Sequence, residues 1–111
     1  MIINLNEDNV KKVEDIIKKH DNVIILYFSD LCYHCNVLKP TWFKLCTHVK
    51  NSNDVVIINA ESNNIKHFKE KYKEGVSGYP TILKFCNGKK KSEYVGERDL
   101  RNLKKFCKKI I

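Results

Sequence analysis

Two cysteines separated by two residues, Cys32 and Cys35, are the part of this sequence best suited to chemistry. They follow a continuous apolar run at residues 23–28, which predicts a central strand buried on both faces. A helix is predicted from residue 32 to 50, so Cys32 is expected at its start. Free backbone N–H groups and the partial positive charge of a helix start stabilise a thiolate and lower its pKa.

The spacing of the pair places Cys35 one helical turn behind Cys32, within reach of a disulfide. His34, when protonated, would add a further positive charge beside the Cys32 sulfur. These features predict that the Cys32 thiolate attacks a substrate disulfide and that Cys35 resolves the mixed disulfide. In the reverse direction the oxidised pair would hand its disulfide to a substrate dithiol. This chemistry needs no metal and no organic cofactor.

A Cys-x-x-Cys pair is also half of a zinc site, for which Cys46 or His48 would be candidate further ligands. A structural zinc site needs four ligands, usually in two paired clusters, and the sequence has no second cluster. Cys46 also falls on the apolar face of its predicted helix. We therefore expect no metal site.

The rest of the sequence alternates between strand and helix patterns, which predicts an α/β fold. Strands are predicted at residues 2–5, 23–28, 55–58, 81–85 and 92–95, and helices at 6–19 with Asn6 as cap, at 32–50, at 63–72 and from 99 onward. Alternation implies parallel pairing in the first part, and the Asn87-Gly88 turn predicts a hairpin that makes the sheet mixed. No linker interrupts the pattern, so one domain over residues 1–111 is expected.

Several side chains are assigned to the core from their type and spacing. The aromatic set is Trp42, Phe43, Phe68, Phe85 and Phe106, and the last helix is expected to bury Leu100, Leu103, Phe106, Cys107 and Ile110. Cys46 and Cys107 are expected in the core because free cysteines are among the most buried residues. Cys86, near a strand end, is expected to be partly exposed. The histidines His20, His48 and His67 are expected in solvent.

The charge and cysteine content exclude several classes of protein. The chain has 111 residues and 21 basic against 13 acidic residues, a net charge of +8. Its lysine pairs are dispersed over predicted helix faces and lack interleaved aromatic residues, which argues against nucleic-acid binding. The odd count of five cysteines disfavours a secreted disulfide scaffold.

The N-terminal residues lack the basic and apolar regions of a signal peptide, and the longest apolar run is too short to cross a bilayer. We expect an intracellular, cytoplasmic, soluble monomer with no membrane contact. The alternative is the lumen of the secretory pathway, if a leader has been removed.

The sequence resembles the thioredoxin superfamily over essentially its whole length. The matching residues are Tyr27 to Cys35, Pro40 five residues after the second cysteine, Gly78-Tyr79-Pro80-Thr81 before a strand, and Asn87-Gly88 in a hairpin. The resemblance implies a thioredoxin fold, with a central mixed sheet flanked by about four helices. It also implies a thiol–disulfide oxidoreductase that acts on protein dithiols and disulfides and is recycled by a redox partner.

Within the superfamily the sequence is most similar to protein disulfide isomerase domains. His34 stands where thioredoxins usually have proline, and residues 76–82 and 94–98 follow the isomerase pattern. The resemblance implies that Pro80 is a cis proline packed against the cysteine pair. It also implies that the Tyr79 backbone binds an extended substrate. Leu31 and Tyr33 would complete the substrate-facing rim.

Three departures from the family pattern bear on function. Leu26 stands six residues before the first cysteine, where the family usually has a buried carboxylate that helps to deprotonate the resolving thiol. Ile57 stands where thioredoxins often have a lysine beside that carboxylate. Leu31 replaces a common tryptophan, and residues 73–75 add length before the proline loop. Because position 26 lacks the carboxylate, slow activation of Cys35 is expected. The alternative function is therefore a weakly catalytic client-binding or scaffold module.

The direction of exchange stays open at this stage. His34 favours an oxidising pair, whereas the expected cytoplasmic location favours a pair that is kept reduced.

Overall fold

A five-stranded mixed sheet organises residues 1–109, which are the residues that the computed structural model describes. The elements are β1 (Ile2–Asn4), α1 (Val10–Lys19), β2 (Val23–Phe28), α2 (Tyr33–Val49), β3 (Val56–Glu61), α3 (Ser62–Ile65), the 3-10 helix η1 (Glu70–Tyr72), β4 (Thr81–Cys86), β5 (Lys89–Glu93) and α4 (Leu100–Phe106). The strand order is β1-β3-β2-β4-β5. The first three strands in this order are parallel, and β4 and β5 are antiparallel to their neighbours.

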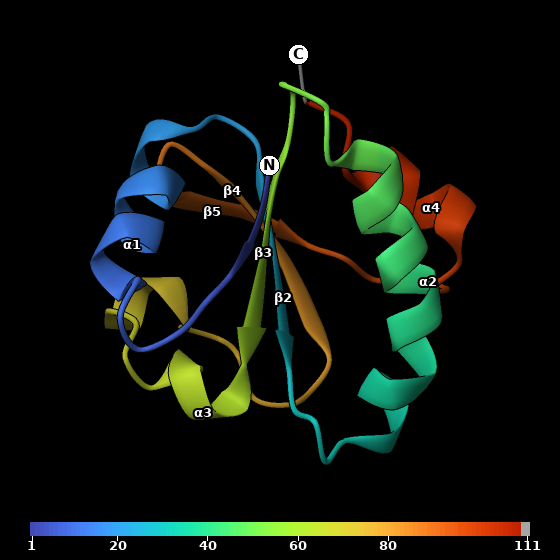
Figure 1. The fold of residues 1–111 in the computed structure, drawn as a ribbon, viewed down its shortest axis with the longest axis horizontal. Helices are drawn as coiled ribbons and strands as arrows, with labels where there is room; N and C mark the ends of the chain where they lie inside the picture. Colours follow the sequence, from blue (N-terminus) through green and yellow to red (C-terminus); the bar gives the residue numbers. More distant parts are fainter. Residues whose placement is uncertain (110–111) are drawn as a thin grey trace.

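The helices cover the sheet in two layers, with α1 and α3 on one face and α2 and α4 on the other (Figure 1). Side chains of β2 alternate between these layers, as strand geometry requires. Val23, Ile25 and Tyr27 pack with the α1 layer, while Ile24 and Leu26 pack with the α2 layer. This double burial explains why β2 is a continuous apolar run. The strand order and the two helix layers confirm the predicted thioredoxin fold.

Helix α2 positions the cysteine pair. Its inward residues are Leu38, Trp42, Leu45 and Val49, all buried against the sheet. The helix begins directly after Cys32 and ends at Val49, so its predicted bounds are confirmed. Because α2 is anchored along its length, the first turn that carries the cysteines is held at the end of β2.

Two predicted helices are shorter in the structure. The α1 helix starts at Val10 instead of residue 6, because the Asn6 side chain accepts hydrogen bonds from the N–H groups of Asp8 and Asn9 and forms a separate turn. The predicted helix at 63–72 is split into α3 and η1. Between them the Lys69 N–H donates to the Glu14 carboxylate of α1 at 2.7 Å. This N–H therefore does not donate to a carbonyl of a continuing helix.

The C-terminal elements also differ in their bounds. The Asn87-Gly88 turn has positive φ at both residues and closes the hairpin immediately, so β5 starts at Lys89 instead of residue 92. Helix α4 ends at Phe106, with Leu103 and Cys107 buried. The predicted burial of Ile110 concerns a residue outside those described.

Most core assignments are confirmed, but Phe43 is 73% exposed and its assignment was wrong. Adjacent residues of a helix point about 100° apart, so Trp42 faces the sheet and Phe43 does not. Phe106 and Cys46 are only half-buried, and Cys86 is partly exposed as predicted. His48 and His67 are exposed, whereas His20 is half-buried with its Nδ1 atom 2.9 Å from the Ile16 carbonyl oxygen. Within residues 1–109 every helix is too short or too polar to span a bilayer.

Candidate active site

The two cysteines lie close together where β2 passes into α2, but their surroundings differ. Cys32 is the N-cap residue of α2 and is partly exposed, whereas Cys35 is only 2% exposed. The Cys35 backbone N–H donates to the Cys32 sulfur over 3.3 Å. The sulfur therefore accepts the kind of hydrogen bond that a side-chain oxygen accepts at an ordinary helix cap.

The electrostatics separate the two thiols. A hydrogen bond from the Cys35 thiol is the main cause that lowers the pKa of Cys32, and backbone N–H groups of Cys35 and His34 and the charge of Arg98 act in the same direction. Burial is the main cause that raises the pKa of Cys35, to about 11, and its hydrogen bond to Cys32 adds to it. The surroundings thus favour the thiolate form of Cys32 and the protonated form of Cys35.

His34 lies on the first turn of α2, as predicted, and its side chain is exposed. Its ring meets the Tyr33 ring edge-on, with centroids 5.4 Å apart. The contribution of His34 to the low pKa of Cys32 comes from its backbone N–H.

Arg98 is a charged neighbour that the sequence reasoning did not assign to the site. It follows β5 and lines a hollow together with His34, Val37 and Gly96. Its positive charge lowers the pKa of Cys32 and also that of Cys35. The only signal in the sequence was its place in the isomerase-like segment at residues 94–98.

Replacing Arg98 with glutamine is expected to raise the pKa of Cys32, because a positive charge near the thiolate is removed. The rate of Cys32 alkylation by iodoacetamide as a function of pH measures this, and the profile is expected to move to higher pH. Arg101→Gln makes the same charge change on α4 and is the control. An unmoved profile in Arg98→Gln would show that its charge does not reach the sulfur.

The loop before β4 completes the surroundings of Cys32. The Tyr79–Pro80 peptide bond is cis, as the resemblance implied. The Cys32 thiol donates to the Tyr79 carbonyl oxygen over 3.4 Å, which brings this loop and the cysteine together. Leu31 is 96% exposed and Tyr33 74% exposed, so both are free to contact a substrate beside Cys32.

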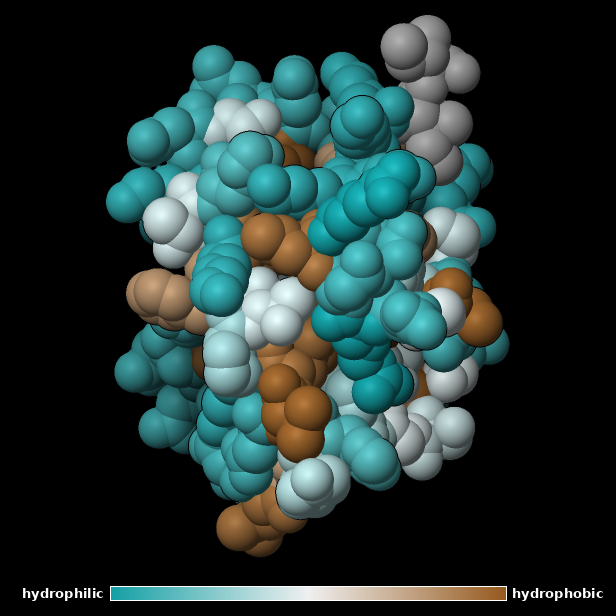
Figure 2. Space-filling model, turned by 90° about the vertical axis from the view of Figure 1, so that its right-hand side faces the viewer, coloured by the Kyte–Doolittle hydropathy of each residue, from teal (hydrophilic) through white to brown (hydrophobic). Residues whose placement is uncertain are grey.

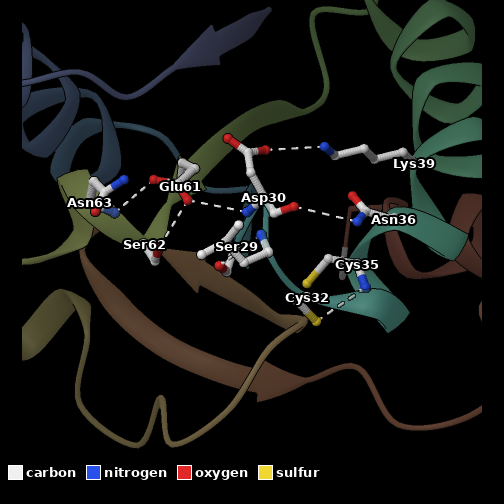
Figure 3. A network of polar contacts seen from close by, with 10 residues as sticks. Ser29, Asp30, Cys32, Cys35, Asn36, Lys39, Glu61, Ser62 and Asn63 are labelled. Carbon is white, nitrogen blue, oxygen red and sulfur yellow. Dashed lines mark hydrogen bonds and ion pairs between the residues drawn. The ribbon is translucent and has the colours of Figure 1, made fainter.

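A polar network holds the loop that precedes Cys32 (Figure 3). The Asp30 N–H donates to the Glu61 carboxylate at the end of β3 over 3.2 Å. The Asn36 side chain donates to the Asp30 carbonyl, and Lys39 pairs with the Asp30 carboxylate at 3.1 Å. These contacts tie the loop to both β3 and α2, and none of the four residues was predicted from the sequence to take part in the site.

A cavity of about 410 Å³ lies behind Cys35, between α2 and the sheet. Leu26, Leu38, Trp42 and Cys46 contribute to its lining, and among its described lining residues there is no carboxylate. The Trp42 indole N–H donates to the Asn59 side-chain oxygen at 2.7 Å. Leu26 and Cys35 thus line the same cavity, and the side chain at position 26, where the family pattern has an acid, is apolar here.

The ligands considered for zinc are not brought together in residues 1–109. Cys46 faces the cavity from the last turn of α2, and His48, in the same turn, is exposed. Within the described residues no three His, Cys, Asp or Glu side chains are grouped as a metal site would need.

A mixed sheet in this strand order, with a Cys-x-x-Cys pair at the start of α2 beside a cis proline, defines a thioredoxin-fold domain. The family model for thioredoxin matches residues 2–109, and the chain belongs to the thioredoxin family.

The curated relatives are larger proteins. Protein disulfide isomerase-like 2-2 of Oryza sativa subsp. japonica is 34% identical over 106 residues, which cover 95% of this chain and 28% of the relative. The thioredoxin domain-containing protein 5 homolog of Drosophila melanogaster is 33% identical over 112 residues, covering 97% of this chain and 26% of the relative. The chain therefore spans about a quarter of the length of these relatives.

Solved structures show the same fold. Human ERp44 matches with a TM-score of 0.76 and 24% identity, over 93% of this chain and 30% of that chain. A mutant thioredoxin from Halobacterium salinarum matches with a TM-score of 0.71 and 21% identity, over 96% of this chain and 87% of that chain.

Proposed function

We propose that this chain is a thiol–disulfide oxidoreductase that exchanges disulfides with protein substrates through Cys32 and Cys35. The observation that carries the proposal is the contrast between a partly exposed thiol of lowered pKa and a buried thiol of raised pKa one turn away. Residues 1–111 are proposed to form one thioredoxin-like domain.

In the proposed reaction the Cys32 thiolate attacks one sulfur of a substrate disulfide, and the other substrate sulfur leaves as a thiolate. The Cys35 thiol then loses its proton to solvent and attacks Cys32. This step forms the Cys32–Cys35 disulfide and releases the second substrate thiolate. The substrate gains two electrons and the cysteine pair loses two.

The substrate is proposed to bind across the exposed rim of Cys32. Tyr79 and Pro80 lie at the cysteine, and Leu31 and Tyr33 offer apolar surface beside it. The names of the curated relatives support protein disulfides as substrates and add isomerisation to the proposal. His34 is proposed to assist Cys32 through its backbone N–H and, when protonated, through its charge.

A non-catalytic client-binding module is the second candidate, and the apolar cavity behind Cys35 favours it. Without a carboxylate beside it, Cys35 loses its proton slowly, so a client would stay bound as a mixed disulfide. A single-turnover experiment with a disulfide peptide separates the two. The oxidoreductase releases the peptide as its dithiol, whereas the module retains the peptide as a mixed disulfide with Cys32 and only one peptide thiol is freed.

The test of the proposed function is the reduction potential of the Cys32–Cys35 pair, titrated in glutathione buffers and read by alkylation and mass spectrometry. Stabilisation of the Cys32 thiolate favours the reduced form and makes the pair more oxidising. We expect a potential nearer to about −180 mV, as in disulfide isomerases, than to about −270 mV, as in thioredoxin. Failure to form the disulfide reversibly would overturn the oxidoreductase proposal.

The potential also bears on the compartment. A value near about −180 mV suits the secretory-pathway lumen, whereas one near about −270 mV suits a reductase in the cytoplasm. The compartment, the recycling partner and the monomeric state remain predictions.

A further inference from the structure

A basic groove lies at the end of α2 that is remote from the cysteines. It is a hollow of about 730 Å³ between the C-terminal part of α2, the segment leading into β3, and α4. We define the basic groove by four cations on its rim, which are Arg101, Lys104, Lys105 and Lys108. The sequence suggested lysines dispersed over separate faces, but the fold gathers these four around one depression.

Within residues 1–109 no carboxylate lies within ion-pair distance of the four cations that define the basic groove. A fifth cation of the lining, Lys109, pairs with Asp21 at 2.9 Å. Asp54 is the only carboxylate among the described lining residues. Like charges placed this close together repel one another, so a bound anion would relieve the repulsion.

A buried lysine lies behind α4 and contacts the backbone of one groove residue, Lys108. Lys84 is 5% exposed behind α4, and its ammonium group donates to the Lys108 carbonyl at 2.9 Å. The buried ammonium group of Lys84 thus already binds the Lys108 carbonyl oxygen, which could otherwise accept a hydrogen bond from a surface lysine. The rim cations remain available to a partner.

The floor of the groove is apolar. Val49, Val55 and Leu100 line it together with the buried Cys107. Figure 2, which faces the α2 and α4 side, shows hydrophilic side chains gathered over the upper part of this face with small apolar areas between them. Cations around an apolar floor fit a partner that carries both carboxylates and apolar side chains.

We propose that the basic groove docks an acidic polypeptide segment in which leucine-like side chains alternate with aspartate or glutamate. Nucleic acid fits the groove less well, because its described lining residues include no Phe, Tyr or Trp for base stacking and only one smaller aromatic ring, the exposed His48 imidazole. Helix α2 has seventeen residues, so the groove lies about 25 Å from Cys32. A docked segment therefore leaves Cys32 free to react.

The test measures binding of a fluorescein-labelled synthetic peptide of glutamate, aspartate and leucine by fluorescence anisotropy. Saturable binding that weakens with added salt is expected. The variant Arg101→Gln with Lys105→Gln removes two exposed cations of the groove and is expected to lower affinity about tenfold. Its unfolding temperature and its rate of insulin disulfide reduction are expected to match those of the parent chain.

The matched control is Lys89→Gln with Lys91→Gln, which removes the same charge from exposed positions of β5. This control is expected to bind the peptide like the parent. Equal losses in both variants would show a general charge effect and overturn the proposal. The proposal would also fail if the peptide did not saturate, or if a single-stranded DNA oligonucleotide bound more tightly and lost more affinity in the groove variant.

Measuring disulfide exchange separately distinguishes failure of this proposal from failure of the proposed function. If the peptide binds but the chain does not catalyse exchange, the docking proposal is supported and the oxidoreductase proposal is overturned. If the chain catalyses exchange but does not bind the peptide, the docking proposal is overturned and the oxidoreductase proposal is supported.

Discussion

Replacing Cys32 with serine is expected to lower catalysed disulfide exchange by on the order of a thousandfold or more. The hydroxyl of serine is not ionised near neutral pH, and the N–H groups around position 32 cannot make it a nucleophile that attacks sulfur. Reduction of insulin by the chain in the presence of dithiothreitol measures the loss. Cys86→Ser removes another partly exposed thiol and is the control, with activity expected to be unchanged.

The matched variant Cys35→Ser separates the two roles within this prediction. It keeps the attacking thiol but removes the resolving thiol, so a mixed disulfide between Cys32 and a substrate peptide is expected to accumulate. Intact-mass measurement detects the adduct. Full activity in Cys32→Ser, or an adduct on another cysteine, would contradict the assignment.

Replacing Leu26 with glutamate is expected to speed resolution of mixed disulfides about tenfold, which is modest for general base catalysis. Leu26 and Cys35 line the same cavity, so a carboxylate at position 26 would lie beside the proton that must leave. Burial would raise the pKa of this carboxylate and make it a better base near neutral pH. Rapid quenching of a preformed adduct between Cys32 and glutathione measures the rate.

The same variant is expected to lower the free energy of unfolding by about 1–3 kcal/mol, because Leu26 is 5% exposed and a polar group would be buried in its place. Urea denaturation measures this cost. Leu26→Gln is the control, since the glutamine side chain has nearly the same shape as glutamate and is also polar, but it has no carboxylate to act as a base. An adduct that decays equally fast in Leu26→Glu and the parent would show that another group takes the proton.

The sequence was sufficient to predict the parts of the site that depend on local structure. The apolar run of β2 and the helical spacing after it placed Cys32 at a helix start, and the structure confirms this. The same helical spacing places Trp42 inward and Phe43 outward. Phe43 was assigned to the core from its residue type alone, and that assignment was therefore wrong.

The contacts between residues far apart in the sequence could not be predicted, because they depend on how the strands and helices pack. Glu61 and Asp30 are thirty-one residues apart, and only the parallel pairing of β2 and β3 brings them together. Arg98 reaches the cysteines from the loop after β5, and the basic groove forms because α4 packs beside the end of α2. Residue types in isolation carried no signal for either arrangement, since both depend on how the layers are stacked.

The outer strands of the sheet bear on the proposed exchange of disulfides with protein substrates. All five residues of β5 are exposed, and three of them are consecutive lysines, while β1 at the opposite edge is only three residues long. Lysine-rich and very short edge strands discourage the addition of a foreign strand. If the proposed substrates are partly folded chains with unpaired strands, we expect them to bind at Cys32 without adding a strand to either edge of the sheet.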